Sequence, residues 1–87
     1  MMTRTELVEH VGSGSLPDHR LYIRGPDRLM DIFRCKIARE IPGVRFQPTH
    51  EYWAINLPVP LRNGEVSLVQ KIIADAPNEL QISDACF

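Results

Sequence analysis

The stretch GVRFQPTHEYWAINLP, residues 43–58, decides the fold that the sequence predicts. Two short runs of alternating apolar residues flank a polar segment from Pro48 to Glu51, which is typical of a β-hairpin with a four-residue loop. Side chains alternate between the two faces of a strand, so one face of this hairpin is apolar. The apolar positions are Val44, Phe46, Trp53, Ile55 and Leu57, and the reverse positions are Tyr52, Ala54 and Asn56. Trp53 either holds the hairpin against a core or presents a flat surface to a ligand, and the alternation favours the core.

Further helices and strands are predicted on both sides of the hairpin. The predicted strands are residues 21–23, 44–47, 52–57 and 80–82, and the predicted helices are residues 26–40 and 65–76. Pro26 and Asp27 suit the start of the first helix, and Pro77 ends the second. The order is β-α-β-β-α-β. Two amphipathic helices bury their apolar stripes most simply against one mostly antiparallel sheet, which predicts an α+β fold, a two-layer sandwich.

Apolar stripes on the helices and the hairpin supply the predicted core. Leu29, Phe33 and Ile37 follow one another at four-residue intervals and so share one helix face. The predicted core residues are Leu29, Phe33, Ile37, Phe46, Trp53, Ile55, Leu57, Val69, Ile72 and Ile73.

The first fifteen residues are predicted to lie outside this domain. Residues 3–11 favour a short, optional helix capped by Thr3 or Thr5, and residues 12–15, Gly-Ser-Gly-Ser, are typical of a flexible joint. We therefore expect an N-terminal helix and joint over residues 1–15, and a single compact α+β domain over residues 16–87.

The distribution of charge hints at an anionic partner. The chain has 87 residues, of which 44% are apolar and 24% charged, and its net charge is −1. Residues 20–71 carry nine Lys or Arg against five Asp or Glu, which leaves +4, whereas both ends are acidic. This balance is less basic than that of a dedicated nucleic-acid-binding domain.

Basic and aromatic residues of this middle segment form the predicted binding surface for nucleic acid or a partner. An open sheet face that carries tyrosine and arginine resembles the surfaces on which bases stack. The candidate residues are Tyr22, Arg24, Arg28, Arg34, Arg39, Arg45 and Tyr52. The alternative is that they are ordinary exposed polar residues with half-buried tyrosines.

The sequence offers little that predicts catalysis. His10, His19 and His50 have no metal-ligand spacing, and no glycine-rich phosphate loop is present. We expect no enzyme activity, no metal and no cofactor. A cluster of His19, His50 and Cys86 in a metal-dependent or thiol enzyme stays an alternative.

Cys35 and Cys86 both have apolar neighbours, so we expect two small buried hydrophobic residues. No apolar stretch is long enough to span a bilayer, and the N-terminus does not resemble a secretory signal. We therefore expect a cytoplasmic protein with no membrane contact.

The run LYIRGPDRLMDIFRCKIAREIPGVRFQPTHEYWAINLP, residues 21–58, resembles the HARP-type (HepA-related protein) domain, a small module found beside SNF2-family annealing helicases. The matching positions are Ile41-Pro42-Gly43, Val44 to Pro48, Trp53, Ile55 and Leu57, and the likeness covers about residues 20–82. It implies a domain that contacts branched or single-strand-containing DNA and assists an ATP-driven motor.

Two functional hypotheses follow from the sequence. The first is a non-enzymatic module that binds branched or single-stranded DNA, or that assists a helicase or nuclease. The second is a protein-interaction factor, an inhibitor or adaptor encoded by a phage or mobile element, that targets a host DNA-processing or defence complex. A homodimer through the exposed edge of Leu80–Ile82 is compatible with both hypotheses.

Overall fold

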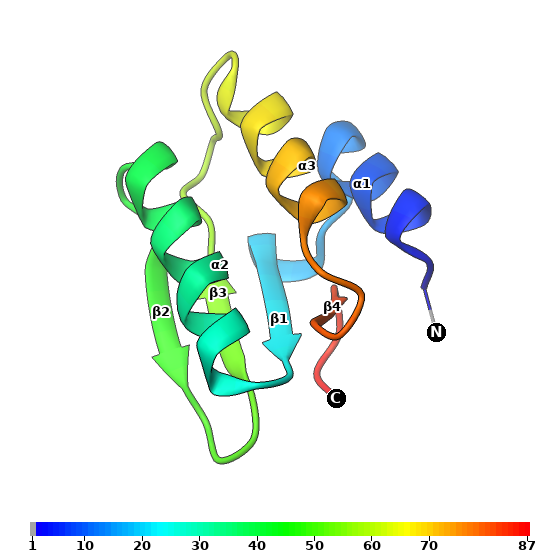
Figure 1. Ribbon diagram of the computed structural model, residues 1–87. Coiled ribbons are helices and arrows are strands. Elements are labelled where there is room, and N and C mark those ends of the chain that lie inside the picture. Colours follow the sequence, from blue (N-terminus) through cyan, green and yellow to red (C-terminus); the bar gives the residue numbers. More distant parts are fainter. Residues whose placement is uncertain (1) are drawn as a thin grey trace.

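Three helices lie on one face of a four-stranded sheet in the computed structural model of the protein, which describes residues 2–87 (Figure 1). The helices are α1 (Arg4–Ser13), α2 (Asp27–Glu40) and α3 (Glu65–Asp75), with a short 3-10 turn at Pro17–His19. The strands are β1 (Arg20–Arg24), β2 (Arg45–Pro48), β3 (Trp53–Asn56) and β4 (Gln81–Ser83). The predicted α+β fold is confirmed. None of the helices in the described residues has the length and apolar composition needed to cross a membrane.

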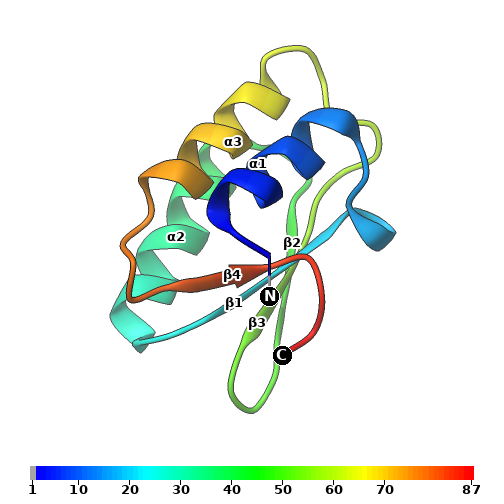
Figure 2. The same cartoon turned by 90° about the vertical axis from the view of Figure 1, so that its right-hand side faces the viewer.

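The strands are ordered β2-β3-β1-β4 in the sheet, and every neighbouring pair is antiparallel. After α1 the elements follow the order β-α-β-β-α-β with β1 and β3 inside the sheet, which is the split βαβ, ferredoxin-like arrangement. Figure 2 shows the layers from the side, with the helices gathered on one side of the sheet. Within residues 2–87, no helix covers the other face of the sheet, as is common in antiparallel sheets.

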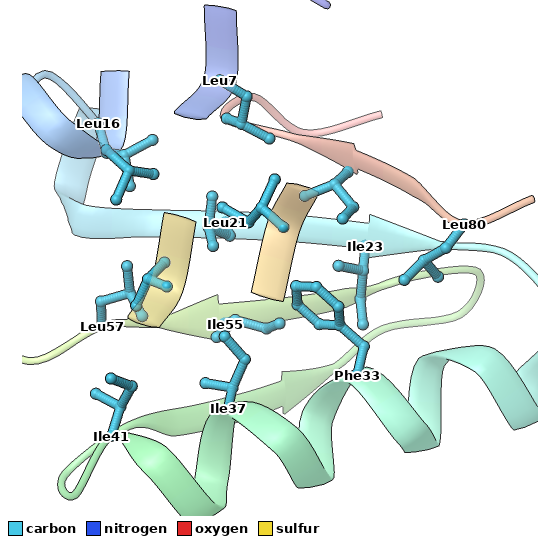
Figure 3. Close-up of a cluster of buried hydrophobic side chains, with 14 of the residues drawn as sticks. Leu7, Leu16, Leu21, Ile23, Phe33, Ile37, Ile41, Ile55, Leu57 and Leu80 are labelled. Atoms are coloured by element: carbon cyan, nitrogen blue, oxygen red, sulfur yellow. The ribbon is translucent and has the colours of Figure 1, made fainter. Parts of the chain in front are cut away.

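The register of the strands sends one set of side chains toward the helices. Leu21 pairs with Ile55, and Ile23 lies between Trp53 on one neighbouring strand and Ile82 on the other. Figure 3 shows Leu21, Ile23 and Ile55 of the strands on the side of the sheet that carries Phe33 and Ile37 of α2. Leu21, Ile23, Ile37 and Ile55 are completely shielded from solvent, so the core lies between the sheet and the helices.

The predicted core residues differ in how deeply they are buried. Phe33, Ile37, Ile55, Leu57, Val69 and Ile73 are buried. Leu29, Phe46, Trp53 and Ile72 are partly buried and pack against the core. On α2 the buried line is Met30, Phe33 and Ile37 rather than the predicted line through Leu29. The helix is therefore rotated slightly from the expected orientation, which leaves Leu29 at the edge of the stripe.

The predicted boundary between residues 15 and 16 is wrong, because α1 belongs to the same core. Leu7 and Val11 are only 1% and 3% exposed, and both contact the central cluster. Thr3 caps α1, and its hydroxyl accepts a hydrogen bond from the Glu6 N–H while the Glu6 carboxylate accepts one from the Thr3 N–H. Gly14 ends the helix with a left-handed backbone, so the predicted joint is largely a helix cap.

A single arginine ties α1 to the far end of the chain. The two terminal NH₂ groups of Arg4 donate to the carbonyl oxygens of Ile73, Ala76, Pro77 and Leu80, each at 2.8 Å. These carbonyls belong to the last turn of α3 and the loop before β4, where a helix leaves acceptors without partners. Partial burial lowers the pKa of Arg4 below its ordinary value.

The expectation that both cysteines are buried is wrong. Cys35 is exposed on α2, because it lies two residues from both Phe33 and Ile37 and therefore on the side of the helix opposite its buried face. Cys86 is also exposed, in the segment that follows β4.

Candidate nucleic-acid interface

The sheet face opposite the helices, here called the open sheet face, is basic and aromatic. The register assigns to it Arg20, Tyr22 and Arg24 of β1, Ala54 and Asn56 of β3, Arg45 and Gln47 of β2, and Gln81 and Ser83 of β4. This set holds three arginines and no acidic residue. It is therefore a surface that attracts anions although the whole chain is slightly acidic.

Tyr22 lies at the centre of the open sheet face. Its partners across β1 are Ala54 on one side and Ser83 on the other, so two small side chains flank the ring. Arg20 and Arg24 lie two residues before and two residues after Tyr22 on β1, so their side chains are on the same face of the sheet. The Tyr22 side chain is half-buried between these small neighbours.

Arg20 is held in place by two neighbours on this face. Its Nε donates to Asn56 Oδ1 at 2.6 Å, and its Nη1 donates to the Tyr22 hydroxyl at 3.3 Å. The hydrogen bond with Tyr22 raises the pKa of Arg20 above its ordinary value. The guanidinium thus stays charged in a fixed position beside the central ring.

Three aromatic rings form a row across the open sheet face. Tyr22 and Tyr52 meet edge to face with their ring centroids 5.9 Å apart, and Tyr52 and Phe87 meet in the same way at 6.0 Å. Tyr52 immediately precedes β3, whereas Phe87 lies in the segment after β4. In Figure 2 that segment turns away from β4 toward the side of the sheet opposite the helices.

Arg24 and Cys86 complete the contacts at the Phe87 end of the row. The Nε and Nη2 of Arg24 donate to Gln81 Oε1 at 3.0 and 2.7 Å, and its Cζ lies 4.5 Å from the centroid of the Phe87 ring. The Cys86 thiol donates to the Tyr52 hydroxyl at 2.8 Å. The interaction with Cys86 is the largest cause of a raised pKa of Tyr52, and loss of hydration adds a smaller rise.

The structure brings together only part of the predicted binding set. Tyr22, Arg24, Arg45 and Tyr52 share the open sheet face. Arg28, Arg34 and Arg39 lie on α2, in the helical layer, so the seven residues do not form one surface. Arg34 instead packs over Trp53 and pairs with Asp31 on the same helix.

Arg20 and Phe87 also lie on the open sheet face, and the sequence-based prediction did not include them. Arg20 could have been found, because it continues the alternation of Tyr22 and Arg24 one step toward the N-terminus. Phe87 carried no such signal, because its position depends on the direction that the chain takes after β4.

A separate pocket of about 320 Å³ lies where the end of α1, the loop after β3 and the start of α3 meet. Its walls are mostly apolar, and His19 is the only titratable side chain among the described residues that line it. Over residues 2–87, no group of three or more His, Cys, Asp or Glu side chains is arranged to hold a metal ion. The cluster of His19, His50 and Cys86 is therefore not formed.

Comparison of the chain with protein-family models, with curated proteins and with solved structures found no match in any of the three. The resemblance to the HARP-type domain stays a prediction from the sequence.

Proposed function

We propose that the protein binds single-stranded nucleic acid on its open sheet face and acts without catalysis. The observation that supports this most directly is the central position of Tyr22, between two small residues and beside Arg20 and Arg24. Bases stack on aromatic rings regardless of sequence, and arginines bind the phosphates between them. A four-stranded sheet with aromatic residues on its central strands is a known design for this task.

A single strand suits this surface better than a regular duplex. The bases of a duplex are stacked on one another inside the helix, so flat rings on a sheet do not reach them. Unpaired bases in single strands, forks and loops are free to turn outward and stack. The proposal therefore includes the single-stranded parts of branched DNA, where such a module would assist a helicase or nuclease.

Fluorescence anisotropy with a labelled single-stranded oligonucleotide tests this proposal, with the matching duplex and a fork as comparisons. Tyr22→Ala should weaken binding by about tenfold, since one stacked base contributes about 1–3 kcal/mol, while Tyr22→Phe keeps the ring and most of the affinity. Arg45→Ala should weaken binding and lower the salt dependence by about one phosphate contact. Arg28→Ala removes the same charge from the helical layer and should leave binding unchanged.

Two results would overturn the proposal. One is the absence of binding to any of the three probes at low salt. The other is an equal loss of affinity in Arg45→Ala and Arg28→Ala. Binding would then not depend on whether the arginine lies on the open sheet face or on α2.

Protein binding is a second candidate function, and a groove between α2 and α3 favours it. Two hollows of about 320 and 130 Å³ share Lys36, Ile72 and Asp75 in their linings. The exposed Leu68 lines the larger hollow, and the exposed Ile32 lines the smaller one. Lys36, Arg39 and Lys71 outnumber the acidic residues Glu40 and Asp75 along the larger hollow. An amphipathic helix with an apolar anchor and acidic flanks fits this groove.

A synthetic helix with leucine on one face and glutamate beside it is the probe for this second function. Lys71→Glu should weaken its binding severalfold, because it reverses a charge at the rim of the groove. Equal binding by the variant and the wild type would exclude the groove as the binding site of the helix. A homodimer through the edge strand β4 also stays a prediction, which light scattering over a range of concentrations would test.

A further inference from the structure

We infer that Phe87 occupies a nucleobase subsite on the open sheet face, so that the segment of residues 84–87 competes with nucleic acid for that subsite. This inference rests on the proposed function. The inference goes beyond the proposed function because it names Arg24 and Tyr52 as the residues of the subsite and Phe87 as the occupant of that subsite in the free protein.

The surroundings of Phe87 are those that a base would require. The Arg24 guanidinium lies over one face of the ring, with Cζ 4.5 Å from the centroid, and Gln81 holds that guanidinium through two hydrogen bonds. Tyr52 meets the ring edge to face at 6.0 Å. A pyrimidine has a six-membered ring like that of phenylalanine, and arginine and tyrosine are the side chains that stack with bases. The subsite thus recognises a flat aromatic ring, which either Phe87 or a base provides.

Phe87 also uses the groups that a ligand would need. The Arg24 guanidinium is engaged with Phe87 and Gln81, and the Tyr52 hydroxyl is engaged with Cys86. Tyr22, Arg20 and Arg45 lie outside these contacts with the segment. A strand therefore has access to the Tyr22 side of the face first and reaches the Arg24 side only when Phe87 leaves.

The segment is held by contacts outside the central cluster of buried side chains, among them one by Asp84, whose side chain is 16% exposed. The Ala85 N–H donates to Ser83 Oγ at 3.1 Å, which starts the turn of the chain away from β4. Asp84 Oδ2 lies 3.4 Å from His10 Nδ1. Ala85 and Cys86 are exposed, and Phe87 does not belong to the cluster of buried side chains. Release of residues 84–87 consequently leaves the core intact.

Occupancy by Phe87 lowers the apparent affinity for nucleic acid. When only a fraction of the molecules is in the binding-competent state, the apparent association constant is the intrinsic constant multiplied by that fraction. Because a stacked cation–aromatic contact at the surface is worth about 0.5–1 kcal/mol, removal of the ring should tighten binding by about two- to fivefold.

The test compares Phe87→Ala with the wild type in the anisotropy assay with a short oligothymidylate. Val59→Ala is the matched control, because it truncates an apolar residue that is 64% exposed and lies in the loop between β3 and α3. Phe87→Ala should bind about two- to fivefold more tightly, and Val59→Ala should bind like the wild type. Unchanged or weaker binding by Phe87→Ala would overturn the inference while the proposed function stands. If neither the wild type nor Phe87→Ala bound the oligonucleotide, both the inference and the proposed function would be overturned.

A measurement on the wild-type protein removes any dependence on a variant. Nuclear Overhauser contacts between the rings of Phe87 and Tyr52 should be present in the free protein and disappear when oligothymidylate saturates it. Contacts that persist in the saturated complex would show that Phe87 is not displaced, and the inference would fall.

Discussion

The guanidinium of Arg34 lies 3.7 Å from the centroid of the Trp53 ring system and covers it on the side of α2. Its Cζ is also 5.9 Å from the Phe46 ring, so one arginine closes the space between α2 and the β2–β3 hairpin. Trp53 is half-buried and packs against the core beneath this cover. The tryptophan of the hairpin therefore supports the architecture, with Arg34 over one face of its ring.

Replacement of Arg34 by alanine should lower the free energy of unfolding by about 1–2 kcal/mol, because both the cation–π contact and the packing of the side chain are lost. Arg34→Lys should recover only part of this, because an ammonium group does not stack as a planar guanidinium does. Urea denaturation followed by tryptophan fluorescence measures the change. Asp31→Ala is the control, and it should cost less than about 0.5 kcal/mol because Asp31 forms an exposed ion pair with Arg34. Equal effects of Arg34→Ala and Asp31→Ala would contradict the stacking role.

Removal of the Arg4 side chain should be among the more damaging single changes at a residue that is only partly buried. Four carbonyl oxygens lose their donors in Arg4→Ala, and a hydrogen bond to a charged group contributes about 1.5–3 kcal/mol when it is well shielded. We expect a total loss of about 2–4 kcal/mol, reduced from the simple sum by solvent and by shared geometry. The stability of Arg4→Lys should lie between that of the wild type and that of Arg4→Ala, since one ammonium group cannot span four acceptors. Thermal unfolding of the three proteins gives the order, and an unchanged midpoint in Arg4→Ala would refute it.

Leu7→Ala should destabilise the whole domain by about 2–4 kcal/mol, because it leaves a cavity beneath α1. The loss should appear as a shift of one cooperative transition observed at Trp53, which is far from Leu7 in sequence. Glu9→Ala, an exposed position on the same helix, should change stability by less than about 0.5 kcal/mol. If α1 were a separate appendage, Leu7→Ala would leave the transition at Trp53 unmoved.

The pKa of Tyr52 should fall toward its ordinary value of 10.0 in Cys86→Ala, because the hydrogen bond to Cys86 is the largest cause of its rise. Ultraviolet titration of tyrosinate measures this change, with Cys35→Ala as the control. The folded protein holds the phenol proton more tightly than the unfolded chain does. The resulting contribution to stability is therefore present below pH 10 and is lost as the pH rises through the folded-state pKa. An identical Tyr52 titration in Cys86→Ala and the wild type would disprove the contact.

Much of the fold was accessible from alternation and periodicity. The hairpin around Trp53 was predicted to within about a residue, and the alternation of Tyr22 with Leu21 and Ile23 predicted which side chains leave the core. The placement of Tyr22, Arg24, Arg45 and Tyr52 on the open sheet face follows from this local pattern. The strand order does not, because it depends on contacts between segments far apart in sequence.

The errors have a common physical origin in tertiary packing. Gly12-Ser13-Gly14-Ser15 looks like a linker, but Gly12 lies so close to Gln70 of α3 that α1 packs tightly on that helix. The binding role of the arginines of α2 stays a prediction, but Arg34 packs over Trp53 instead of joining the open sheet face. Cys35 looks like a core residue from its neighbours in sequence, but it lies two residues from both Phe33 and Ile37 and therefore on the opposite side of α2.

The clamp formed by Arg4 has a consequence for how the molecule assembles. Its partners lie 69 to 76 residues farther along the chain, so the acceptors have not been synthesised when the donor leaves the ribosome. Strand β1 likewise waits for β4 before it gains its second neighbour. Closing such long loops is entropically costly and slows folding relative to a helical bundle of the same size. A nascent chain of this protein thus remains unfinished, and open to chaperones, until almost the last residue of the sheet has emerged.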